Sequence, residues 1–132
     1  MNKESIELLQ NSWKQISQNR NLIIEKFYHR LFQSSPDLRT LFNQDLSIPI
    51  RQFAGMLNIT INGIEQMDLI KDSLSSLGAA HRKIGVTPEQ VKTMEETLIQ
   101  TFREELDTQF NDELERIWRE AFNILVQRMG LK

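Results

Sequence analysis

The sequence predicts an all-α fold built from about seven helices. Along most of the chain, apolar residues recur at alternating spacings of three and four, which is typical of helices that cover a core. No stretch shows the strict alternation of apolar and polar residues that is typical of a half-buried strand. The chain has 132 residues, of which 39% are hydrophobic and 26% are charged. This is enough for one packed domain, and we expect residues 1–132 to form it.

The expected helices follow one another with short connections. Pro36, Pro49 and Pro88 each closely follow a capping hydroxyl, which favours a helix start, and Asn111 is the expected cap of the last helix. The expected helices cover residues 3–17, 20–33, 36–42, 49–65, 69–82, 88–106 and 112–129. Their inward residues, in chain order, are Ile6, Leu9, Trp13 and Ile16; Ile24, Tyr28, Leu31 and Phe32; Leu38 and Leu41; Phe53, Met56, Leu57, Thr60, Ile61 and Ile64; Ile70, Leu74, Leu77 and His81; Val91, Met94, Leu98, Thr101, Phe102 and Leu106; and Leu114, Ile117, Trp118, Ala121, Phe122, Leu125 and Val126.

Composition and motifs argue against several classes of protein. The formal net charge is −2 with acidic and basic residues interleaved, so the basic patch typical of a nucleic-acid binder is not expected. The sequence has no cysteine, no 18-residue apolar run for a membrane helix and no leader pattern, which favours a cytoplasmic protein. Nucleophile-elbow, phosphate-loop and zinc-helix motifs are missing from it, so no catalytic residue is assigned.

One histidine occupies an inward place on the fifth expected helix. Gly78 stands in the preceding turn, beside Ala79 and Ala80, and a glycine inside a helix costs about 1 kcal/mol relative to alanine. It therefore indicates a close approach by something bulky. Two interpretations of His81 remain open here: a core histidine satisfied by one hydrogen bond, or the ligand of a cofactor metal. The inward stripe, at spacings of 4, 3, 4 and 3, is Ile70, Leu74, Leu77, His81 and Ile84.

A large planar apolar cofactor would account for an inward histidine accompanied by aromatic residues on other helices. Its edges would pack on Phe42 and Phe53, and its metal would bind His81. Haem held by a single imidazole leaves the opposite coordination position open for a gas. Its propionates would need cations, for which the sequence offers Arg39, Arg51, Arg82 and Lys83.

Three segments of the chain carry a family resemblance. They are FYHRLFQSSPDLRTLF at residues 27–42, NGIEQMDLIKDSLSSLGAAHRKIGV at residues 62–86 and WREAF at residues 118–122. Pro36 stands six residues before Phe42, and a glycine-valine turn follows His81. In this order and spacing, from Ile6 to Met129, the sequence resembles single-domain bacterial haemoglobins, which are globins related to flavohaemoglobins.

The resemblance implies roles for individual residues around haem b. His81 would be the metal ligand, and Phe42, Phe53, Arg82 and Val86 would contact the cofactor. Tyr28 stands where this family points a phenol at the bound gas; the other interpretation is a core tyrosine bonded to the backbone. By its place on the helix we interpret His29 as a surface histidine that pairs with Glu25.

The sequence also departs from the pattern of this family. Pro49 aligns with the distal position that usually holds glutamine or histidine, and proline offers no donor. Gln52 or Arg51 would have to swing inward to supply the missing hydrogen-bond donor. Phe53 takes the place of the apolar residue that crowds the ligand. Val91 stands where the family has a proximal tyrosine.

The expected function is that of a haem-b globin that reversibly binds O₂, CO or NO. By resemblance, NO dioxygenation is a plausible activity, but its electrons would come from a separate reductase because the chain has no reductase domain. The alternative is a haem-based gas or redox sensor that acts through a partner protein. A globin fold without haem, used as a structural module, is a third possibility that His81 and Phe42 argue against.

Overall fold

A computed structural model describes residues 1–131, and within them the chain is helical with no strand. This confirms the predicted all-α class. The helices are α1 (Lys3–Ser17), α2 (Arg20–Ser34), the 3-10 helix η1 (Pro36–Leu41), α3 (Ser47–Asn62), the 3-10 helix η2 (Ile64–Ile70), α4 (Lys71–Lys83), α5 (Pro88–Leu106), the 3-10 helix η3 (Asp107–Gln109) and α6 (Asp112–Arg128). No helix among these residues has the length and apolar character needed to cross a membrane.

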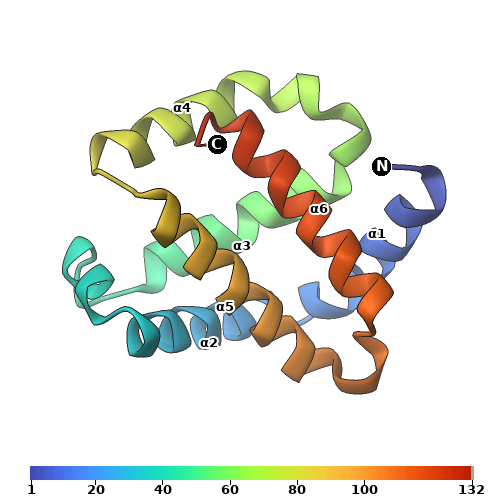
Figure 1. The fold of residues 1–132 in the computed structure, drawn as a ribbon, viewed down its shortest axis with the longest axis horizontal. Helices are drawn as coiled ribbons and strands as arrows, with labels where there is room; N and C mark the ends of the chain where they lie inside the picture. The colour runs from blue at the N-terminus through green and yellow to red at the C-terminus, as the bar shows by residue number, and fades with distance from the viewer. Residues whose placement is uncertain (132) are drawn as a thin grey trace.

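Five of the α-helices pack against one another, and α4 lies at the edge of the molecule (Figure 1). α2 packs against α3 and α5, and α1 packs against α3 and α6. α4 packs mainly against α6 and the adjoining η2. In the view of Figure 1, α4 lies along the upper edge, α2 lies along the lower edge, and α3 and α5 run between them. The helix that carries His81 therefore depends on α6 for its placement.

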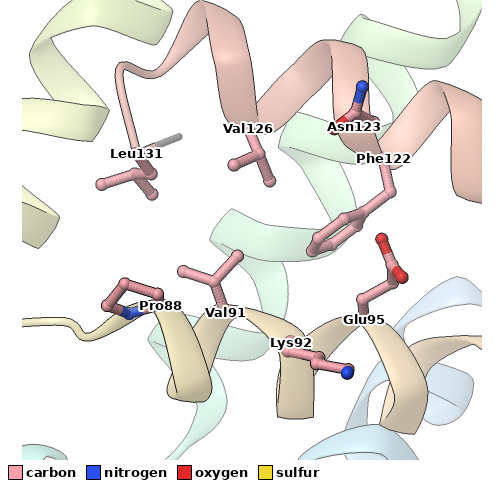
Figure 2. A pocket seen from close by; sticks show the side chains of 8 residues that line it. All are labelled: Pro88, Val91, Lys92, Glu95, Phe122, Asn123, Val126 and Leu131. Carbon is pink, nitrogen blue, oxygen red and sulfur yellow. The ribbon is translucent and has the colours of Figure 1, made fainter.

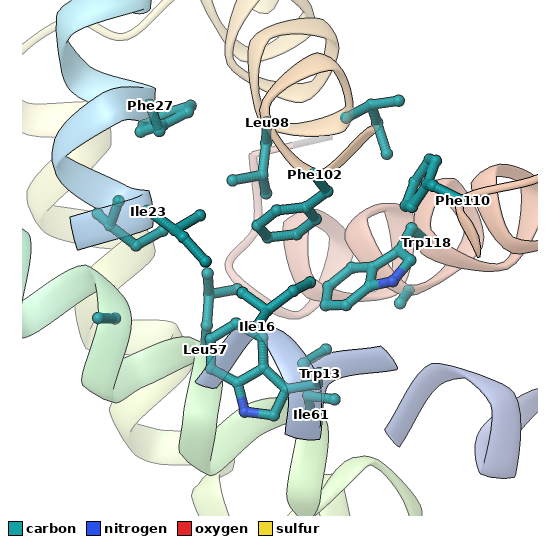
Figure 3. Close-up of a cluster of buried hydrophobic side chains, with 14 of the residues drawn as sticks. Trp13, Ile16, Ile23, Phe27, Leu57, Ile61, Leu98, Phe102, Phe110 and Trp118 are labelled. Atoms are coloured by element: carbon teal, nitrogen blue, oxygen red, sulfur yellow. The ribbon is translucent and has the colours of Figure 1, made fainter. Parts of the chain in front are cut away.

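The buried side chains form two separate clusters. The larger one joins α1, α2, α3, α5 and α6, and Figure 3 shows part of it. At its centre, the rings of Phe102 and Trp118 have centroids 4.8 Å apart, and the indole N–H of Trp118 donates to Ser12 Oγ at 2.9 Å. The smaller cluster lies where α4, η2 and α6 meet and consists of Met67, Leu74, Leu125 and Met129. α4, which carries His81, thus packs on this smaller cluster.

The start of α3 differs from the prediction. We expected a helix from Pro49 capped by Ser47, but α3 begins at Ser47 and has no side-chain cap at Leu46. The Asp45 carboxylate accepts a hydrogen bond from the Ser47 N–H at 3.0 Å, and this bond lowers the pKa of Asp45. Pro49 lies in the first turn, where N–H groups have no partner inside the helix, so the missing donor costs little.

The segment between α3 and α4 also differs. The predicted helix over residues 49–65 ends at Asn62, and Gly63 caps it. The chain then forms η2, with a non-helical backbone at Gln66, before α4 begins at Lys71 rather than Leu69. A run of apolar residues at helical spacing cannot distinguish a 3-10 turn from an α-helix, which explains both errors.

Candidate functional site

His81 is half-buried in the last part of α4, and its ring is fixed by its own helix. Its Nδ1 lies 2.7 Å from the carbonyl oxygen of Leu77, one turn earlier. A carbonyl can only accept, so Nδ1 carries the proton and donates. In the neutral form of the ring, the other nitrogen, Nε2, keeps its lone pair, and it makes no hydrogen bond with any residue from 1 to 131. A neutral imidazole oriented in this way is a typical metal ligand.

A glycine turn fixes the end of α4 just after His81. Gly85 has φ +83°, which favours glycine. Its N–H donates to the Arg82 carbonyl at 3.0 Å, and the Val86 N–H donates to the His81 carbonyl at 3.2 Å. This pair of bonds is the Schellman ending of a helix. The backbone of His81 is thereby held, and Val86 follows it half-buried.

Gly78 does permit a close approach, but its partner is another helix. A Cβ built on Gly78 would lie 1.6 Å from the carbonyl oxygen of Met129 at the end of α6. Ala79 and Ala80 are exposed. The bulky group that Gly78 admits is therefore the end of α6. The glycine is needed because α4 and the end of α6 touch backbone to backbone.

Tyr28 lies among four phenylalanine rings from three segments of the chain. Its ring is stacked on Phe32 with centroids 5.8 Å apart, and it meets Phe27, Phe42 and Phe53 edge to face at 5.2, 5.5 and 6.2 Å. α2, α3 and the turn after η1 thus converge on this one phenol. Phe42 and Phe53 remain only half-buried and so keep apolar surface for a further contact.

The hydroxyl of Tyr28 makes no hydrogen bond within residues 1–131, although only 7% of the residue is exposed. The alternative interpretation, a core tyrosine whose hydroxyl is hydrogen-bonded to the backbone, therefore does not apply to these residues. Burial raises its pKa to about 12, so the hydroxyl stays protonated throughout the physiological range. The hydroxyl oxygen itself keeps some solvent exposure, because it is not among the fully buried side-chain atoms without a hydrogen-bond partner. The site therefore contains a donor that a small polar ligand would satisfy.

Arg39 holds the turn that presents Phe42. Its guanidinium donates to the carbonyl oxygens of Phe42, Asn43 and Gln44 at 3.2, 2.8 and 3.1 Å. It also lies over the Phe32 ring, 5.3 Å from the centroid. The sequence offered Arg39 as a cation for a cofactor carboxylate, whereas the structure gives it the role of bracing this loop.

The inner face of α3 carries Pro49 and Phe53, one turn apart. Phe53 contacts the rings of Tyr28 and Phe27, and Pro49 is half-buried. Gln52 and Arg51 are exposed, so neither of them has swung inward to supply the donor that Pro49 lacks. Tyr28 is accordingly the polar side chain placed among these aromatic rings.

Two further sequence predictions are corrected. Arg82 was expected to face the cofactor, but its Nη1 donates to the carbonyl oxygens of Met129 and Gly130. His29 is exposed as expected, but its Nε2 lies 3.4 Å from the Gln33 amide nitrogen, and no ion pair with Glu25 occurs in the described chain. In neither case could helix periodicity alone predict the hydrogen-bond partner.

A cavity of about 310 Å³ separates the start of α5 from the end of α6 (Figure 2). Val91 and Phe122 point into it from opposite sides, with Val126 and Leu131 beside them. Lys92 and Glu95 stand at its rim. The small side chain of Val91, where the related globins were expected to carry a tyrosine, helps to leave this space unfilled.

With the geometry established, comparison with known proteins identifies the family. A family model described as Globin matches residues 25–129, most of the chain. The chain belongs to the globin family. It is 25% identical over 128 residues to a flavohemoprotein of Halalkalibacterium halodurans. The aligned region covers 95% of this chain but only 31% of that protein. The globin described here thus spans about a third of the length of that relative.

Solved structures share the globin fold. A bacterial globin from Campylobacter jejuni superimposes with a TM-score of 0.83 at 18% identity, covering 98% of this chain and 95% of that one. An engineered carbene transferase, derived from a candidate nitric oxide dioxygenase of Rhodothermus marinus, gives a TM-score of 0.87 at 20% identity, covering 98% and 90%. These likenesses establish the fold of the chain.

Membership in the globin family implies haem binding, and the described side chains fit a haem. His81 offers one unprotonated nitrogen for iron. Phe42 and Phe53 keep apolar surface that a flat porphyrin would cover, and the unpaired Tyr28 hydroxyl suits a ligand on the iron. The sequence indicated all four of these residues. It could not show that Nδ1 of His81 is committed to Leu77, although the four-residue spacing between them is compatible with such a bond.

Proposed function

We propose that this protein is a haem-b globin that reversibly binds O₂, CO or NO. The observation that carries the proposal is the unpaired hydroxyl of Tyr28, a buried residue that lies within an aromatic cluster; this hydroxyl has no hydrogen-bond partner among the described residues. A donor that no protein group already occupies is what a small ligand with partial negative charge requires. Haem, when bound, supplies an iron atom with a coordination position for such a gas.

Three kinds of side chain would cooperate in this pocket. His81 would bind the iron through Nε2, because Nδ1 is committed to the Leu77 carbonyl. Phe42, Phe53 and Val86 would contact the porphyrin and exclude water. Tyr28 would donate its hydroxyl proton in a hydrogen bond to the gas. Since Pro49 cannot donate, Tyr28 would act without the usual second donor.

The cations for the haem propionates need reassignment. Arg39 and Arg82 are engaged with backbone carbonyl groups, which makes them poor candidates. Arg51 and Lys83 are exposed side chains, one on α3 and the other on α4. We propose that these two cations pair with the propionates.

NO dioxygenation is the catalytic activity that we propose for this site. The reaction combines NO, O₂ and one electron to give nitrate. We propose that a reductase supplies this electron; the chain spans about a third of the length of the flavohemoprotein that it resembles. The flavohemoprotein relative and the Rhodothermus marinus neighbour, whose parent is described as a candidate nitric oxide dioxygenase, support this proposal.

The experiment is to mix haem-loaded protein, first reduced to the ferrous state and then equilibrated with O₂, with NO and to measure nitrate. Without a reductant we expect no more than a single turnover of nitrate. With NADH and a separate flavin reductase we expect repeated turnover. Nitrate no higher than in a protein-free control would refute the dioxygenase proposal. If O₂ still bound reversibly in that case, the gas-binding proposal would remain.

A further inference from the structure

We propose that Arg82 is a positioning residue that sets the orientation of His81 by fastening α4 to the C-terminal turn of α6. This inference rests on the proposed function, because it assumes that His81 holds the haem iron. The residues concerned are Arg82 itself and the segment Met129–Leu131, which we call the α6 latch.

The α6 latch is a glycine turn whose last carbonyl groups point at Arg82. Gly130 has φ +72°, and its N–H donates to the Gln127 carbonyl at 3.0 Å, while the Leu131 N–H donates to the Val126 carbonyl at 3.0 Å. These two bonds complete a Schellman ending. The next two carbonyl oxygens, those of Met129 and Gly130, each accept from Arg82 Nη1 at 2.9 Å.

A positive charge suits this place. The carbonyl end of a helix carries partial negative charge, so a guanidinium there is stabilising. Gly130 leaves room for it, because a Cβ built on Gly130 would lie 2.7 Å from Arg82 Nη1. An arginine donor on the last carbonyls of another helix thus joins the ends of two helices that are 47 residues apart in sequence.

The contacts with α6 lie along one face of α4. Leu74, Gly78 and Arg82 are spaced by four residues and therefore share a face. Leu74 is buried in the small cluster with Met129, Gly78 touches the Met129 backbone, and Arg82 bonds to the Met129 carbonyl. His81 precedes Arg82 and so points roughly 100° around the helix from this face. The docking face thus determines where the imidazole points.

No other element can substitute for this docking face. α4 packs mainly against α6 and η2, and α3 and α5 are not among its main partners. Leu74 and Gly78 fix the middle of α4, while Arg82 is the contact closest to His81. Without Arg82, the contacts with α6 and its cluster closest to His81 would be those of Gly78 and Leu77, one turn earlier. The direction of Nε2 would then vary.

The test compares Arg82→Ala with Lys71→Ala in full-chain protein loaded with haem. Lys71 is an exposed cation at the other end of α4, so its replacement removes the same charge from the same helix. Three quantities are measured: the rate of haem transfer to an excess of apomyoglobin, the iron–histidine stretching band of the reduced protein by resonance Raman spectroscopy, and amide hydrogen exchange across residues 78–83. Gly130→Ala disturbs the α6 latch from the other side.

For Arg82→Ala and Gly130→Ala we expect haem transfer at least tenfold faster, a shifted or broadened iron–histidine band and at least tenfold faster exchange in residues 78–83. Lys71→Ala should match the wild type in all three, and Arg82→Lys should recover part of the effect. Values for Arg82→Ala equal to those of Lys71→Ala would overturn the positioning role.

The same spectra separate this inference from the proposed function. An iron–histidine band that is present in the wild type and unchanged in Arg82→Ala contradicts the positioning role alone. If the wild type has no such band and His81→Ala leaves the spectra of the haem-loaded protein unchanged, His81 is not the iron ligand, and both proposals fail.

Discussion

Replacement of Gly78 by alanine should destabilise the protein by about 2–3 kcal/mol, in the upper range for overpacked sites. The added Cβ would lie 1.6 Å from the Met129 carbonyl oxygen and within 3 Å of two more backbone atoms of that residue. Backbone at a capped helix end cannot move away as a flexible side chain can. Helix propensity alone predicts the opposite sign, a gain of about 1 kcal/mol.

Gly55→Ala is the matched control for Gly78→Ala. Gly55 lies inside α3, and a Cβ built on it meets nothing within 4 Å. This variant should therefore keep the propensity gain of up to about 1 kcal/mol. Urea unfolding of the haem-free proteins, followed by circular dichroism, gives both free energies of unfolding without a contribution from ligand binding. Equal stability gains in the two variants would show that α4 and α6 are not in backbone contact.

Tyr28→Phe should raise the O₂ dissociation rate by tenfold or more, which corresponds to about 1.4 kcal/mol or more of lost stabilisation. The variant keeps the ring and its packing on Phe32, Phe42 and Phe53, and it loses only the unpaired hydroxyl. Stopped-flow displacement of O₂ by CO measures this rate. The free energy of unfolding should hardly change, because the hydroxyl has no partner in residues 1–131.

Two controls sharpen the test of Tyr28. Gln52→Ala should change the O₂ dissociation rate far less, because Gln52 is exposed. A larger effect at Gln52 than at Tyr28 would mean that Gln52 replaces the donor that Pro49 lacks. In the wild type the rate should stay constant from pH 6 to pH 10, since burial raises the pKa of Tyr28 to about 12 and keeps its proton in place.

The fold could be predicted because helix periodicity and helix-start signals agree along the chain. The Thr87–Gln90 capping box and the Asn111 cap occur where they were expected. Errors occurred where apolar spacing is ambiguous, as in η2, and where a carboxylate in the preceding loop shifted the start of α3. Such choices depend on local hydrogen bonds that periodicity does not encode.

The candidate site could be predicted in part. His81, Tyr28, Phe42 and Phe53 were named from their places on helices and from the family resemblance. The partners of Arg39 and Arg82 could not be predicted. Each of these side chains donates to backbone carbonyl groups, which have no signature in a sequence. For the same reason, Gly78 indicated a close approach without revealing that its partner was Met129.

The most direct test of the central claim is the visible absorption spectrum of the purified, haem-reconstituted protein, recorded after reduction and then with CO, beside His81→Ala. We predict a haem Soret band that shifts sharply with CO in the wild type. In His81→Ala the band should be lost or altered, with partial recovery when imidazole is added. A wild-type protein that takes up no haem, or a His81→Ala spectrum identical to that of the wild type, would contradict ligation of haem by His81.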